Sequence, residues 1–265
     1  MRPNWQVDLK WLAGLACLVC ILLASTAYSF SKLTEEEPAT GIFTGIVATF
    51  AMEGSEPEDF AEIQAQAAAN PDDDFTIGDI TLPVAGREIA SLSYEEAVDL
   101  VVGRIAETLY ADGPAAVEQY FADSVENDSG DEFSLGPFGL LTRNTHDTVS
   151  PFLIAFTVGA LLLSAFLVYV SLRFGRLGSP GAVLAAGTGP FALLWFAIKE
   201  GTKDTDGEGV GSALAQALSP TAGEAAGDFL RLFILGLVLI FAATIGHLGW
   251  AVWERLQRSH NLDPA

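Results

Sequence analysis

The chain has 265 residues, 50% of them hydrophobic, and yet its formal net charge is −21. Acidity of this size usually accompanies low hydrophobicity in a soluble protein, so the two properties are reconciled only if apolar and acidic residues occupy different segments. The excess of acidic groups also argues against nucleic-acid binding, which needs basic surfaces.

Most of the acidic residues lie between residues 29 and 150. This segment holds 25 of the 34 Asp and Glu residues but only four of the 13 Lys and Arg residues. The scarcity of Lys and the abundance of carboxylates resemble those of proteins from extreme halophiles. At molar salt the Debye length is about 3 Å, so surface carboxylates no longer repel one another strongly. We expect an archaeal, halophilic source; an acidic domain in ordinary salt is the alternative.

The chain begins with a short basic head, residues 1–10, followed by a first apolar run over residues 11–28. The run is long for the apolar core of a signal peptide and favours a retained transmembrane helix, with Ser25-Thr26-Ala27 as the cleavage site of the alternative. Cys17 and Cys20 lie three residues apart within this run, on one side of the expected helix. No basic neighbour would activate either thiol, so we interpret both as small buried residues.

Residues 29–150 are expected to form an acidic extracytoplasmic domain that is mostly helical. The apolar spacing predicts a helix over 41–52. This helix is too short to span a membrane, and we expect it to pack on the domain, with the membrane surface as the alternative. Further expected elements are a helix over 55–69, a small hairpin within 75–91, a helix over 93–110 that starts with a capping box of Ser93 and Glu96, and another helix that starts at Asp112-Gly113-Pro114.

The stretch 151–172 divides this domain from the C-terminal half of the chain. It has no charged residue and would form a helix of about 33 Å, close to the hydrocarbon thickness of a bilayer. Arg173 and Arg176 follow it as a basic stop. The remaining segments are a cytoplasmic turn (173–179), a third span (180–198), a second extracytoplasmic loop (199–228), a fourth span (229–253) and a cytoplasmic tail (254–265).

Basic residues are concentrated in the head, the turn and the tail, which together hold six of the Lys and Arg residues. Under the positive-inside rule these segments face the cytoplasm. The expected fold class is therefore a membrane α-helical protein of the plasma membrane with four transmembrane helices. Both termini would lie in the cytoplasm, and the acidic domain would lie outside.

The middle of the third span contains Gly187, Gly189 and Pro190. Pro190 lacks an N–H and the glycines loosen the helix around it. This stretch is therefore a candidate helix break that could line a transport path. A kink or close packing between helices is the alternative.

The fourth span carries a second candidate, His247, which is the only ionisable residue well inside a predicted span. Such residues are functional candidates in membranes, and a structural hydrogen bond to another helix is the alternative. The small residues Ala242, Gly246 and Gly249 around it are predicted to pack against another helix.

Two weaker motifs lie outside the predicted spans. Asp204, Asp206 and Glu208 resemble part of a calcium loop but lack the spacing of an EF-hand. We therefore predict no metal site and expect these carboxylates to be solvated. Asn127 starts a glycosylation sequon on the extracytoplasmic side.

The sequence contains no nucleophile elbow, phosphate loop, zinc-protease motif or haem motif, and no cofactor is expected. We predict a non-catalytic membrane protein, an accessory subunit or cell-envelope scaffold. Besides membrane lipid, its expected partner is another protein or a second copy of the chain, bound through the acidic domain. A small transporter or channel component that uses the third span and His247 is one alternative, and an extracytoplasmic sensor is another.

Overall fold

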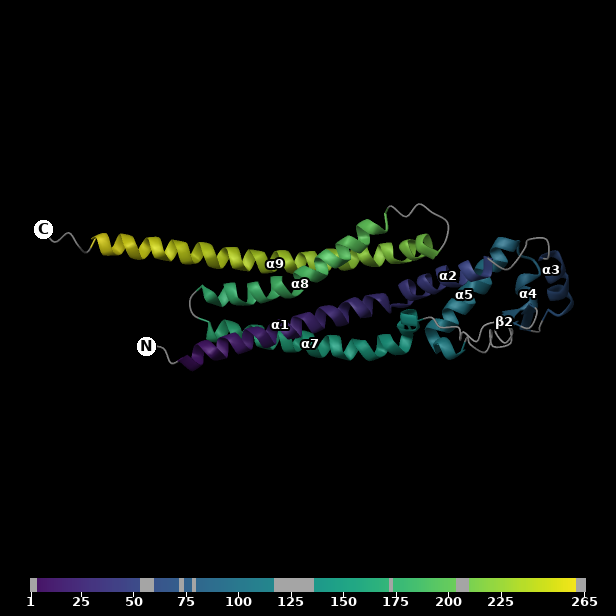
Figure 1. Ribbon diagram of the computed structural model, residues 1–265, viewed down its shortest axis with the longest axis horizontal. Coiled ribbons are helices and arrows are strands. Elements are labelled where there is room, and N and C mark those ends of the chain that lie inside the picture. The colour runs from purple at the N-terminus through teal and green to yellow at the C-terminus, as the bar shows by residue number, and fades with distance from the viewer. Residues whose placement is uncertain are drawn as a thin grey trace. The chain divides into compact units, whose positions relative to one another are not determined.

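The computed structural model describes residues 4–52, 60–71, 74–77, 80–116, 136–171, 174–203 and 210–260. The chain divides into two compact units (Figure 1). The bundle unit comprises Met1–Ser29, Ser150–Ile198 and Ala222–Ala265, and the acidic unit comprises Phe30–Val149 and Lys199–Thr221.

Four long helices supply the candidate membrane spans: α1 (Asn4–Leu33), α7 (Arg143–Val170), α8 (Gly175–Gly201) and α9 (Val210–His260). Each contains a stretch that is long and apolar enough to cross a membrane. The prediction of four apolar helices is therefore confirmed, and the architecture is consistent with an all-helical membrane protein.

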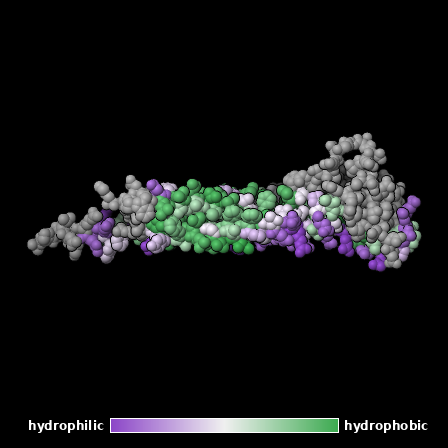
Figure 2. Space-filling view, turned by 90° about the horizontal axis from the view of Figure 1, so that it is seen from below, coloured by the Kyte–Doolittle hydropathy of each residue, from purple (hydrophilic) through white to green (hydrophobic). Residues whose placement is uncertain are grey.

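The outer surface of the bundle unit is apolar. Leu193 and Phe241 are 73% and 67% exposed, and Figure 2 shows such side chains as a broad hydrophobic area. Exposure of so much apolar surface to water is unfavourable in free energy. Exposure to lipid tails is not, because the tails are as apolar as the side chains. The interior combines small groups such as Ala13, Cys17 and Ala160 with larger ones such as Leu167 and Trp195.

All four long helices extend beyond the predicted spans. α1 continues to Leu33, α7 begins at Arg143, α8 runs from Gly175 to Gly201, and α9 begins at Val210. The second half of the expected loop over 199–228 is helical, while its position outside the membrane stays a prediction. That half is rich in alanine, which has the highest helix propensity, and this favours a helix despite the interspersed glycine and acidic residues.

The core of the acidic unit is built mainly by α2 (Glu36–Met52) and α5 (Tyr94–Asp112), which pack closely together. Ile42 and Phe43 of α2 meet Val102, Ile105 and Leu109 of α5 in one buried cluster. The helix predicted over 41–52 therefore exists and packs within this unit. The first turns of α9 contribute partly buried side chains to the same cluster, namely Leu214, Ala217 and Leu218.

A small hairpin and two short helices also belong to the acidic unit. Strands β1 (Asp74–Ile77) and β2 (Ile80–Ala85) are antiparallel, as predicted. They follow α3 (Phe60–Ala69) and lead into α4 (Gly86–Ile89). Gly86 is required at this corner because a Cβ there would lie 2.5 Å from the carbonyl oxygen of Asn70. A 3₁₀ helix, η2 (Gly136–Leu140), precedes α7.

The predicted capping box at the start of α5 is present. The Ser93 hydroxyl accepts the Glu96 N–H, and the Ser93 N–H donates to the Glu96 carboxylate over 2.8 Å. The Ser93 hydroxyl also donates to this carboxylate over 2.8 Å, and the two bonds donated by the Ser93 backbone N–H and hydroxyl hold the pKa of Glu96 below its usual range. Two backbone donors at the helix end are thereby satisfied.

Candidate functional sites

The predicted break at Gly187–Pro190 is not present: α8 is continuous from Gly175 to Gly201. A Cβ on Gly187 would lie 2.5 Å from Cγ2 of Ile21, and one on Gly189 would lie 3.2 Å from the Phe233 ring. The glycines thus allow α1 and α9 to approach α8 closely, which is the packing alternative. Pro190 forgoes one backbone hydrogen bond, but its fixed φ is compatible with a helix.

The small residues of the fourth span are only partly in the predicted contact. Gly246 lies against the Phe174 ring, where a side chain would overlap it. Ala242 is exposed, and a Cβ on Gly249 would meet no atom within 4 Å. The buried partner of this face is instead Ala243, whose Cβ would lie 3.2 Å from one on Gly178. Of the three residues predicted to pack against another helix, only Gly246 does so. Ala243 takes the place predicted for Ala242, and Gly249 faces open space.

His247 lines a groove of about 750 Å³ within the bundle unit. Lys10 of α1 and Ser171, which follows α7, line the same groove. Residues of the first turn of α8 line it as well. Among the described residues the lining contains no Asp or Glu. Gly187, Gly189 and Pro190 do not line it, so the two transport candidates occupy separate places.

The two cysteines of α1 are free thiols. Cys17 is buried, and its Sγ lies 3.3 Å from Oγ of Ser164 on α7. Cys20 lies near Gly159, where a Cβ would come within 3.6 Å of its Sγ. Both thiols therefore contribute to the packing of α1 against α7.

Asp204, Asp206 and Glu208, together with the sequon at Asn127, lie outside the described residues. The calcium-loop comparison and the glycosylation site therefore stay predictions. Within the described ranges, no group of three His, Cys, Asp or Glu side chains could hold a metal ion.

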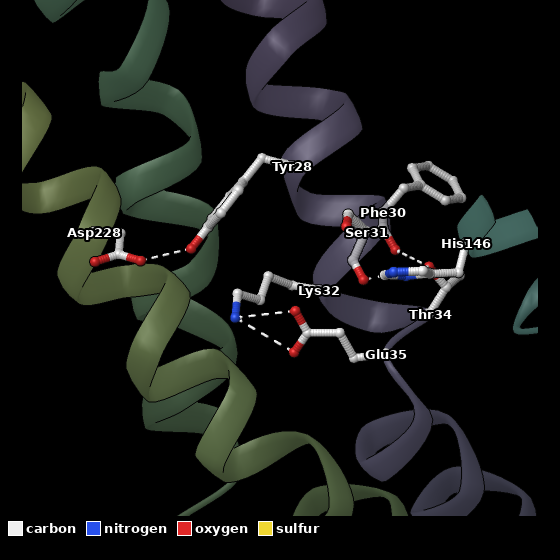
Figure 3. Close-up of polar contacts among 8 residues, drawn as sticks. All are labelled: Tyr28, Phe30, Ser31, Lys32, Thr34, Glu35, His146 and Asp228. Atoms are coloured by element: carbon white, nitrogen blue, oxygen red, sulfur yellow. Dashed lines mark hydrogen bonds and ion pairs between the residues drawn. The ribbon is translucent and has the colours of Figure 1, made fainter. Parts of the chain in front are cut away.

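A polar contact that was not predicted joins α1 to α9 in the bundle unit (Figure 3). The Tyr28 hydroxyl donates to Oδ2 of Asp228 over 2.5 Å, and Nη1 of Arg231 lies 3.1 Å from Oδ1 of the same carboxylate. The Tyr28 ring also meets Phe229 edge to face, with ring centroids 5.4 Å apart. Asp228 thus has a partner for each of its oxygens.

A second contact joins α8 to α1. Nε1 of Trp195 donates to Oγ of Ser29 over 3.0 Å, and Ser29 in turn donates to the Ser25 carbonyl. Trp195 is only 2% exposed, so its N–H needs such a partner. Trp195 was not predicted as a site residue, because nothing in its own segment shows which helix it faces.

The junction between α1 and α2 forms a polar cluster within the acidic unit. The hydroxyl of the buried Thr34 donates to the Phe30 carbonyl and lies 3.3 Å from Nδ1 of His146. Figure 3 shows these residues together. The Tyr110 hydroxyl donates to the Thr34 carbonyl oxygen over 3.2 Å. Burial, and then the negative charge of Glu36, raises the pKa of Tyr110. This cluster connects three helices of the unit.

These clusters are hydrogen-bonded contacts between helices, and none combines a nucleophile, a base and an orienting group in the described part of the chain. Comparison with protein-family models, with curated proteins and with solved structures gives no match. The fold therefore defines only a class: a mostly helical chain with four candidate membrane spans, divided into two compact units.

Proposed function

We propose that the chain is a non-catalytic multi-pass protein of the plasma membrane, an accessory subunit or cell-envelope scaffold. Its acidic unit would bind a protein partner. The observation that carries this proposal is the folded core of that unit, in which α2 and α5 pack together. Membrane anchoring alone does not require a second unit with its own core.

Exposed carboxylates on α5 supply the contact surface in this proposal. Glu95, Asp99 and Glu107 are exposed, and Glu95 and Asp99 are neighbours on one side of the helix because they are four residues apart. Arg104 is exposed as well and lies 3.6 Å from Glu107. A partner with a basic surface would form ion pairs with these carboxylates at contact distance, which molar salt screens less than long-range attraction, and the charge pattern would set its orientation.

We place the acidic unit outside the cell and both termini in the cytoplasm. The support is the clustering of Lys10, Arg176 and Arg255 in segments at the cytoplasmic side of the proposed spans. This placement gives the acidic unit access to partners in the cell envelope.

We further propose adaptation to high salt. The acidic unit holds most of the carboxylates of the chain, and their repulsion is weak only when salt screens it. Chemical unfolding of the full chain at low and at molar potassium chloride tests this. Equal stability in the two solutions would contradict the adaptation.

The transport alternative has less support, because α8 is continuous and the space at its glycines is filled by Ile21 and Phe233. The two functions separate in one experiment: purification of the full chain from native membrane in high salt. The proposal expects a stoichiometric partner protein and no ion flux in liposomes. A lone chain that conducts ions, with flux lost in Pro190→Ala, would contradict it.

A further inference from the structure

The groove in the bundle unit combines an apolar wall with basic and hydroxyl groups. Trp11, Val170 and Ile240 contribute apolar surface, and Lys10 and His247 contribute nitrogen groups. Its volume of about 750 Å³ lies within the usual range of small-molecule sites, roughly 300–1,000 Å³. Since no described lining residue is acidic, the groove offers positive charge without a built-in counter-ion.

The positive end of a helix adds to this charge. The first turn of α8, a helix of 27 residues, lines the groove. Nζ of Lys10 lies 3.7 Å from the place that a Cβ on Gly175 would occupy, so the ammonium group reaches the N-terminus of α8. The ammonium group of Lys10 and the positive end of the α8 dipole thus lie close together. Their mutual repulsion is relieved when an anion binds between them.

A buried hydroxyl provides a separate indication of a ligand. Ser171 lines the groove and is only 1% exposed, and its Oγ has no hydrogen-bond partner among the described residues. Buried polar groups are rarely left unsatisfied. An anionic oxygen in the groove would give this hydroxyl an acceptor.

We infer that this groove binds an anionic phospholipid of the surrounding membrane. The phosphate would lie near Lys10, Ser171 and His247, and the start of an acyl chain would lie along Trp11 and Ile240. Basic pockets between transmembrane helices on the cytoplasmic side are known to suit such headgroups. The apolar wall favours a lipid over free phosphate. This inference does not depend on the proposed partner of the acidic unit.

The test measures binding of phosphatidylglycerol and of phosphatidylcholine to the full, delipidated chain in detergent, by native mass spectrometry at one fixed salt concentration. The wild-type chain should prefer phosphatidylglycerol. Lys10→Gln should weaken phosphatidylglycerol binding by roughly fivefold, the effect expected for one basic residue near an anionic headgroup, and His247→Gln should weaken it as well. Lys203→Gln is the matched control, because it removes the same charge outside the groove.

A second pair of variants tests the space itself. Gly14 lines the groove and has room for a side chain, so Gly14→Trp should fill the groove and reduce lipid binding. Gly249→Trp is its control, since Gly249 also has open space but lies outside the groove. Equal affinity for the two lipids, or affinity unchanged in Lys10→Gln and Gly14→Trp, would overturn the inference. So would full displacement of phosphatidylglycerol by inorganic phosphate, or occupation of the groove by a second copy of the chain.

Discussion

The Tyr28 hydroxyl donates a hydrogen bond of 2.5 Å to the carboxylate of Asp228, 200 residues further along the chain. A bond to a charged acceptor contributes about 1.5–3 kcal/mol. Tyr28→Phe should lower the free energy of unfolding in detergent by about that amount, because the ring is kept and only the donor is lost. Tyr169→Phe is the control: Tyr169 is 83% exposed on α7. Equal stability of the two variants would show that the Tyr28 bond contributes nothing.

The glycines of α8 and α9 should respond to alanine with opposite signs. Gly187→Ala places a methyl group against Ile21, a stiff β-branched side chain, and overpacking of this kind costs about 1–3 kcal/mol. Gly223→Ala adds a methyl group to open space within α9 and should stabilise the helix by roughly 0.5–1 kcal/mol. Thermal unfolding of both variants in one detergent measures the difference. Stabilisation by both would mean that α1 and α8 are further apart than described.

Tyr110 should make the acidic unit sensitive to alkaline pH. Burial, followed by the charge of Glu36, raises the folded-state pKa above the ordinary tyrosine value of about 10. The resulting stabilisation is fully present below pH of about 10 and is lost as pH rises through the raised folded-state pKa. Tyr110→Phe should therefore remain less sensitive to alkali than the wild-type chain, although it also loses the bond to Thr34. Parallel alkaline unfolding curves for the two chains would exclude this assignment.

The four apolar runs, the capping box at Ser93 and the amphipathic α2 could be predicted from the sequence, because each depends on local spacing or composition. The early start of α9 was missed, since alanine-rich helices and flexible loops share small residues. The contacts of Tyr28 with Asp228 and of Trp195 with Ser29 join distant segments. Which helices pair, and with which faces, depends on packing across the whole bundle, and periodicity within one helix does not encode it.

Topology can be tested by placing single cysteines at exposed positions. Two suitable variants are Asp99→Cys and Arg176→Cys, because Asp99 is exposed on α5 and Arg176 is exposed in the first turn of α8. A membrane-impermeant maleimide applied to intact cells should label Asp99→Cys at once and Arg176→Cys only after the membrane is disrupted. The parent chain, with Cys17 buried and Cys20 partly buried, provides the background. The reverse labelling pattern would invert the proposed orientation.

The most direct test of the proposed function is a charge reversal at the exposed carboxylates Glu95 and Asp99 of α5. Glu95→Lys combined with Asp99→Lys should release the partner from the full chain during purification from native membrane in high salt. Glu62→Lys, which reverses an exposed charge on α3 of the same unit, should retain it. The predicted result is a partner band at one-to-one ratio in the wild-type chain and Glu62→Lys, and its loss in the double variant. A partner retained equally by all three chains, or no partner in any of them, would contradict binding through the acidic unit.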